Sequence, residues 1–166
     1  MADFIYQEPY PIQADKTEYR LLTKDYVKVV ECDGRKILQV DPKGLELLAK
    51  EAYADVSFYL RASHLQKLAN ILKDPEATDN DKFVAYTMLL NQCVAAEGQL
   101  PTCQDTGTAI CIGHKGEDVY TGANDAECIS RGVYESYKER NLRYSQVVPF
   151  TMTEEKNSGT NLPAQI

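Results

Sequence analysis

The chain has 166 residues, of which 43% are hydrophobic, and its 25 acidic against 18 basic residues give a net charge of −7. The basic residues are scattered, so neither nucleic acid nor an anionic membrane surface is expected as a partner. No apolar run is long enough to cross a bilayer, and the first residues lack the basic and apolar segments of a secretory signal.

The first 25 residues are predicted to form an extended N-terminal arm. This stretch is rich in charge and glutamine, and Pro9 and Pro11 favour extended backbone over helix. Residues 26–166 are expected to fold as one domain. Near its start, two β-branched runs at residues 26–31 and 36–40 flank an Asp-Gly pair, which predicts a β-hairpin.

Two helices are predicted after the hairpin. Asp41 followed by Pro42 is typical of an N-cap and a first helical residue, and apolar residues then recur at spacings of three and four as far as Leu60. Ser63 and Gln66 have the form of a capping box, which predicts a second, shorter helix that ends near the next Asp-Pro pair.

Two further helices are predicted from start signals. One begins at Thr78 or Asp79, and the last begins at Asn124, has Glu127 three residues later and continues to about Arg140. Apolar residues are expected along one side of the first of these helices, at Phe83, Tyr86, Leu89, Leu90 and Val94.

The fold class that these elements favour is α+β. We expect a mostly helical layer packed on a small mixed sheet, with the extended arm and the β-hairpin in addition. The sheet is expected to include a short buried strand at residues 109–113 and a partner strand at residues 118–121. Residues 141–166 show little periodicity. Their apolar ending indicates a boundary inside a longer protein.

The five cysteines are odd in number and include no Cys-x-x-Cys pair. A disulfide framework and a self-contained zinc site are therefore not expected. The plain interpretation is a reduced intracellular protein whose cysteines are mostly small core residues. The cysteines are Cys32, Cys93, Cys103, Cys111 and Cys128.

The run Cys103-Gln104-Asp105-Thr106-Gly107 carries the chemistry of this sequence. A thiol, an amide, a carboxylate and a hydroxyl occupy consecutive positions between a proline and a glycine, just before an apolar stretch. Thiolate ligates iron–sulfur clusters, and a neighbouring carboxylate can act as acid or base. The alternative is a structural turn, in which the aspartate caps, the glycine permits positive φ and the cysteine packs.

The stretch around this run resembles the first cysteine motif of the class I iron–sulfur fumarate hydratases. Four other stretches resemble the same family in the same order, and the similarity extends from about Tyr6 to the last residue. The stretches are residues 71–82, 100–109, 131–134, 141–146 and 159–166. Tartrate dehydratases of the iron–sulfur type share the cysteine motif.

The resemblance implies that residues 26–166 are the N-terminal domain of an iron–sulfur hydro-lyase that interconverts fumarate and (S)-malate. Such enzymes are homodimers in the cytoplasm, and three cysteines hold a 4Fe-4S cluster whose remaining iron binds substrate. Cys103 matches the first of these ligands, and the other two would follow Ile166. The chain alone is therefore expected to lack the cluster and to be inactive.

By the same resemblance, Gln104, Asp105 and Arg143 contact the dicarboxylate substrate, and Asp105 lies near the proton that moves. A guanidinium suits this role because it binds carboxylate through a bidentate fork. The alternative for Arg143 is a surface salt bridge. For the whole chain, the alternatives are a tartrate dehydratase subunit and a non-catalytic binding module or subunit.

Overall fold

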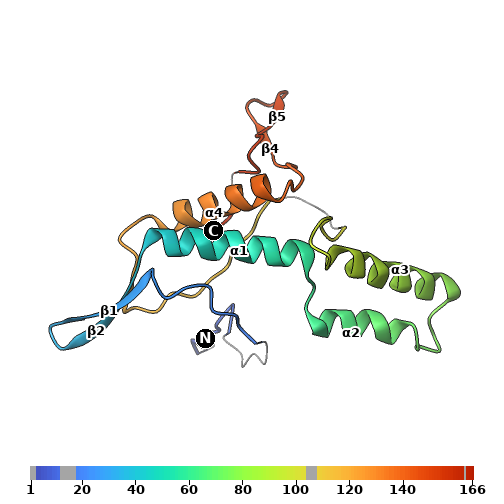
Figure 1. Ribbon diagram of the computed structural model, residues 1–166, viewed down its shortest axis with the longest axis horizontal. Helices are drawn as coiled ribbons and strands as arrows, with labels where there is room; N and C mark the ends of the chain where they lie inside the picture. The colour runs from blue at the N-terminus through green and yellow to red at the C-terminus, as the bar shows by residue number, and fades with distance from the viewer. Residues whose placement is uncertain (1–2, 12–17, 104–107, 163) are drawn as a thin grey trace.

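The computed structural model describes residues 3–11, 18–103, 108–162 and 164–166. Within these residues, four helices occur with one three-stranded and one two-stranded sheet (Figure 1). The α+β class expected from the sequence is confirmed. None of the described helices combines the length and the apolar character needed to span a membrane.

The predicted hairpin consists of β1 (Val27–Cys32) and β2 (Arg35–Val40), paired antiparallel with Val27 opposite Val40. Asp33 and Gly34 connect the strands with φ values of 48° and 76°. Positive φ at both turn positions matches the twist of a two-residue hairpin. Asp-Gly adopts this conformation readily, which is why the pair predicts the hairpin. β3 (Val119–Tyr120) adds to β2 in parallel and makes the sheet mixed.

The prediction of a buried strand at residues 109–113 is wrong. Only an isolated parallel bridge forms there, between Ile110 and Gln165. Ile110 and Ile112 are both exposed, so the apolar run does not lie inside a sheet. Its pairing partner comes from the end of the chain, which local pattern cannot reveal.

Helices α1 (Pro42–Phe58) and α4 (Asp125–Glu139) lie side by side (Figure 1). Both begin where the sequence predicts, because the side chain of Asp41 accepts from the Lys43 N–H and that of Asn124 accepts from the Ala126 and Glu127 N–H groups.

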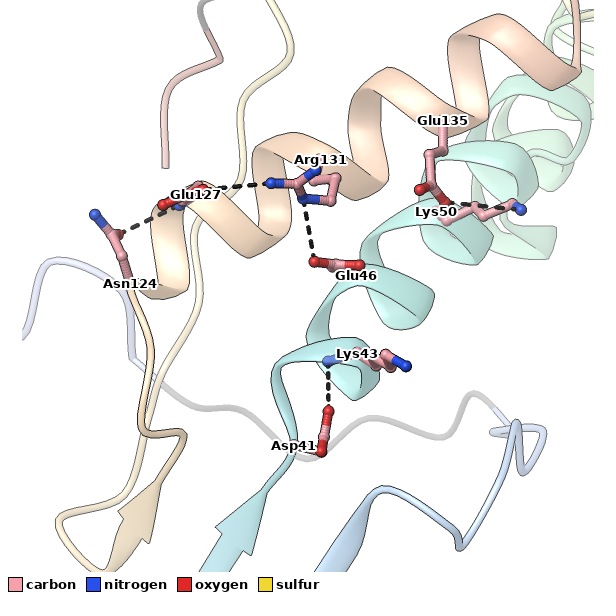
Figure 2. Close-up of polar contacts among 8 residues, drawn as sticks. All are labelled: Asp41, Lys43, Glu46, Lys50, Asn124, Glu127, Arg131 and Glu135. Atoms are coloured by element: carbon pink, nitrogen blue, oxygen red, sulfur yellow. Dashed lines mark hydrogen bonds and ion pairs between the residues drawn. The ribbon is translucent and has the colours of Figure 1, made fainter.

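Ion pairs between α1 and α4 show how the two helices run relative to each other. Arg131 of α4 contacts Glu46 at 3.2 Å, and Lys50, one turn further along α1, contacts Glu135 at 3.9 Å (Figure 2). Lys50 also contacts Glu139 at 2.6 Å. Residue numbers rise together along both helices, so the two helices run in the same direction. Parallel neighbours need a long connection, which here contains α2, α3, β3 and the segment that carries Cys103.

The backbones of α1 and α4 approach most closely at Gly132. A Cβ atom at this position would lie 2.3 Å from the carbonyl oxygen of Glu46. Next to this contact, Val133 is fully buried. The main hydrophobic core continues from it toward the end of α1 and comprises Phe58, Ala109, Val133, Tyr137 and Leu142.

Helices α2 (Ala62–Ile71) and α3 (Asp79–Ala95) form a second pair. Thr78, one of the two predicted start residues, caps α3, and its side chain and that of Asp81 form a capping box. The prediction of a capping box at Ser63 is wrong. Helix α2 starts after Arg61 with no side-chain cap, and Ser63 lies inside the helix. Backbone N–H groups of the first turn instead bond to the Arg61 carbonyl.

Residues 3–11 and 18–26 of the N-terminal stretch contain no helix or strand. Arg20 fastens this stretch to α1 through contacts of 3.0 Å with both Glu51 and Asp55. At the other end, β4 (Val147–Pro149) and β5 (Glu155–Asn157) form a small antiparallel hairpin that the sequence analysis missed.

Candidate functional site

A cavity of about 200 Å³ brings together two of the predicted site residues, Cys103 and Arg143. They come from separate segments, one before β3 and one after α4. The cavity lies against the main core, since Tyr137 and Leu142 belong to both. Its lining residues are Ser57, Pro101, Thr102, Cys103, Tyr137, Leu142 and Arg143.

Two other predicted site residues, Gln104 and Asp105, lie outside the described residues. Their roles in substrate binding and proton transfer stay predictions that rest on the sequence resemblance. A larger cavity of about 450 Å³ lies beside Arg20 and Arg140 and contains none of the predicted site residues.

Gln92 of α3 fixes Thr102, the residue before Cys103. Its Nε2 donates to the Phe58 carbonyl at 2.7 Å, and its Oε1 accepts from the Thr102 hydroxyl at 2.9 Å. The Thr102 N–H donates to the Ser57 carbonyl at 2.8 Å. Gln92 is only 6% exposed, so these bonds satisfy a buried amide and join α1, α3 and the loop. Sequence reasoning missed this residue, although glutamine among apolar helix positions was a signal.

Cys103 itself is held by its backbone rather than by its thiol. The Cys103 N–H donates to Oδ1 of Asn91, the residue before Gln92 on α3, at 3.0 Å. Cys103 is exposed. Cys103 is therefore accessible from solvent while α3 fixes its main chain, an arrangement compatible with a role as a ligand.

Arg143 owes its position to the way α4 ends. Asn141 adopts a left-handed conformation with φ of 51°, and the Leu142 N–H donates to the Tyr137 carbonyl at 2.9 Å. This is a Schellman motif, accompanied by the usual apolar contact between the residues that it joins. The chain turns sharply, Leu142 enters the core, and Arg143 follows at the cavity. Its Nε donates to Oγ of Ser145 at 3.4 Å.

Tyrosines near the cavity stay neutral at physiological pH. Burial, together with the nearby Cys111 and Tyr137, raises the pKa of Tyr53 to about 12, and its hydroxyl donates to the Ile110 carbonyl at 2.9 Å. Burial also raises the pKa of Tyr137. Among the described residues that line the cavity, Arg143 is the charged side chain, which favours an anion there.

The chain is similar to a known protein family over most of its length. The family model described as "Fumarate hydratase (Fumerase)" matches residues 46–166, which include Cys103 and Arg143. The chain belongs to the fumarate hydratase family.

Individual members of the family are similar over nearly the whole chain. "Fumarate hydratase class I, anaerobic" from Escherichia coli (strain K12) is 57% identical over 98% of this chain, and the aerobic class I enzyme of the same strain is 56% identical. "Fumarate hydratase 1, mitochondrial" from Leishmania major is 54% identical over 91% of it. The chain spans about 30% of the length of the two Escherichia coli relatives.

The donor set of this fumarate hydratase chain does not fit a complete iron–sulfur cluster. Among the described residues, no three Cys, His, Asp or Glu side chains come together. Cys103 can contribute one thiolate, whereas such clusters need several protein ligands. The expectation that the other cysteines lie mostly in the core is wrong: Cys128 is buried and Cys111 partly buried, but Cys32 and Cys93 are exposed.

Proposed function

We propose that this chain is the N-terminal part of a class I fumarate hydratase, a hydro-lyase that interconverts fumarate and (S)-malate. The observation that carries the proposal is the shared cavity of Cys103 and Arg143, the described residues that match the family's cluster and substrate motifs. The names of the relatives favour fumarate over tartrate as substrate.

The proposed role of Arg143 is to bind one carboxylate of the substrate. Fumarate and malate are dianions, and a guanidinium accepts a carboxylate in a bidentate, charge-assisted geometry. Gln104 would contact the same substrate, and Asp105 would act on the proton at the carbon beside a carboxylate. Arg143 and Cys103 are both exposed, so an anion can reach the guanidinium from solvent.

The proposed role of Cys103 is to supply one ligand to a 4Fe-4S cluster. Such a cluster supplies Lewis-acid chemistry when bound. Its other ligands would come from parts of the enzyme outside this chain. The complete enzyme is proposed to be a cytoplasmic homodimer, in which the present chain provides one wall of the site.

The test uses a full-length enzyme that contains this chain, reconstituted with iron and sulfide without oxygen and assayed with fumarate and with tartrate. Cys103→Ser should lose iron and nearly all activity, whereas Cys93→Ser, at an exposed cysteine outside the cavity, should retain both. Asp105→Asn should keep iron and lower kcat by about 100-fold or more. Tartrate turnover without fumarate turnover, or full activity in Cys103→Ser, would disprove the proposal.

A further inference from the structure

Asn161 has features that an ordinary loop residue lacks. It is 0% exposed and adopts a left-handed conformation with φ of 57°. Its Oδ1 accepts hydrogen bonds from the N–H groups of both Ser145 and Gln146, each at 3.1 Å. A carboxamide oxygen has two acceptor sites, so one buried atom fixes two consecutive peptide groups from a distant segment.

The segment that Asn161 fixes is the one that carries Arg143. The hydroxyl of Ser145 accepts from Nε of Arg143 and donates to the Arg143 carbonyl, both at 3.4 Å. A path of hydrogen bonds therefore runs from Asn161 through Ser145 to the guanidinium group.

Gln146 links Asn161 to the end of the cysteine motif. Gln146, held by Asn161, accepts at Oε1 from the hydroxyl of Thr108 at 2.9 Å. Further along, the Gln165 N–H donates to the Ala109 carbonyl at 2.8 Å. Asn161 thus lies where the Arg143 segment, the cysteine segment and the tail meet.

The other half of the carboxamide makes no such bond. Among the described residues, Nδ2 of Asn161 is buried without a hydrogen-bond partner. Its neighbour is Tyr137, whose pKa is raised by burial and lowered by the Asn161 side chain. An unpaired buried amide costs about 1–3 kcal/mol, so an asparagine here needs a compensating role.

We propose that Asn161 is a positioning residue for Arg143: it holds the backbone at Ser145 and Gln146 so that the guanidinium stays at the wall of the Cys103 cavity. This inference rests on the proposed function, because only a carboxylate substrate would make that position matter for turnover. Asparagine combines an accepting oxygen with tolerance of positive φ, and few residues offer both.

Two variants separate positioning from simple folding. Asn161→Gly removes the carboxamide but adopts positive φ without strain. Asn161→Asp keeps an accepting oxygen at the same place. In the 166-residue chain, Asn161→Gly should accelerate amide hydrogen exchange at Ser145 and Gln146, while Asn161→Asp should keep their protection. Unchanged exchange in Asn161→Gly would overturn the inference.

In the reconstituted full-length enzyme, Asn161→Gly should raise KM for fumarate about tenfold with less than about a threefold change in kcat, and Asn161→Asp should recover most of the KM. In an Arg143→Ala background, Asn161→Gly should change KM no further, because it acts through that side chain. A wild-type enzyme that does not turn over fumarate would refute the proposed function. With an active wild type, an additive double mutant or an unchanged KM would refute this inference.

Discussion

Cys103 and Cys128 differ in the access that solvent has to their sulfur atoms. Cys103 is exposed, whereas Cys128 is buried in α4. The pKa of the Cys128 thiol is raised mainly by burial and also by the negative charge of nearby Glu46. Less thiolate and less access both slow alkylation. We therefore expect iodoacetamide to label Cys103 faster than the partly buried Cys111, and Cys128 slowest of all. Mass mapping over time gives the order, and faster labelling of Cys111 than of Cys103 would contradict the described loop.

Arg143 offers a second prediction at the scale of one residue. Arg143→Lys keeps a positive charge but loses the planar fork and the Nε donor that meets Ser145. If the guanidinium binds the ground state and the transition state alike, KM for fumarate should rise about tenfold while kcat changes little. Steady-state kinetics on full-length enzyme of known iron content measure this. A fall in kcat at unchanged KM would show instead that Arg143 acts in the chemical step.

At the scale of elements, Gly132 sets the distance between α1 and α4. Alanine is ordinarily favoured over glycine within a helix by about 1 kcal/mol. Here, however, the added Cβ would lie 2.3 Å from the Glu46 carbonyl and 2.7 Å from Cβ of Ala49, so the helices must separate.

We expect Gly132→Ala to lower the free energy of unfolding by about 1–3 kcal/mol, as overpacking does. Gly113→Ala is the matched control, because a Cβ there meets nothing within 4 Å, and it should change stability by less than about 0.5 kcal/mol. Urea denaturation of both variants gives the comparison, and a stabilised Gly132→Ala would show that the helices are not in close contact.

Elements with a local cause were predictable from the sequence. Asp41, Thr78 and Asn124 each cap a helix with their own side chain, and Asp-Gly forms the hairpin turn by its own backbone preference. The errors occur where this local signal is absent or misleading, as at the missed β4–β5 hairpin. The bridge at Ile110 depends on the end of the chain, and α2 begins without any capping side chain.

Some residues of the candidate site could be predicted from the sequence, and others could not. Cys103 and Arg143 were found because their neighbouring residues resemble family motifs, and the structure brings both to one cavity. Gln92 and Asn161 were missed, since their importance lies in backbone groups that belong to other segments. The apolar neighbours of Gln92 on α3 hint that it is buried, but the sequence around either residue does not show which backbone groups it contacts.

At the scale of the whole molecule, the apolar side of α3 is open to solvent. The sequence correctly gives α3 as a helix, but Phe83 is 67% exposed and Tyr86 53%. The buried Ala85 of α3 lines a cavity together with Leu68 and Ile71 of α2. Apolar exposure of this kind marks a surface that another part of a larger protein can cover. The α1–α4 pair, by contrast, buries its own core.

Iron content is the last prediction, and it belongs to the whole chain. The described residues place one exposed thiol at the candidate site and assemble no group of three ligating side chains anywhere. A single thiolate leaves most irons of a four-iron cluster without protein ligands, so a cluster formed on this chain should be lost on purification.

The purified 166-residue chain should therefore be colourless after anaerobic reconstitution and desalting, with less than about one iron per several chains. The Cys103→Ser chain is the matched control and should give the same value. Stoichiometric iron that disappears in Cys103→Ser would mean that this chain gathers further ligands around Cys103 by itself.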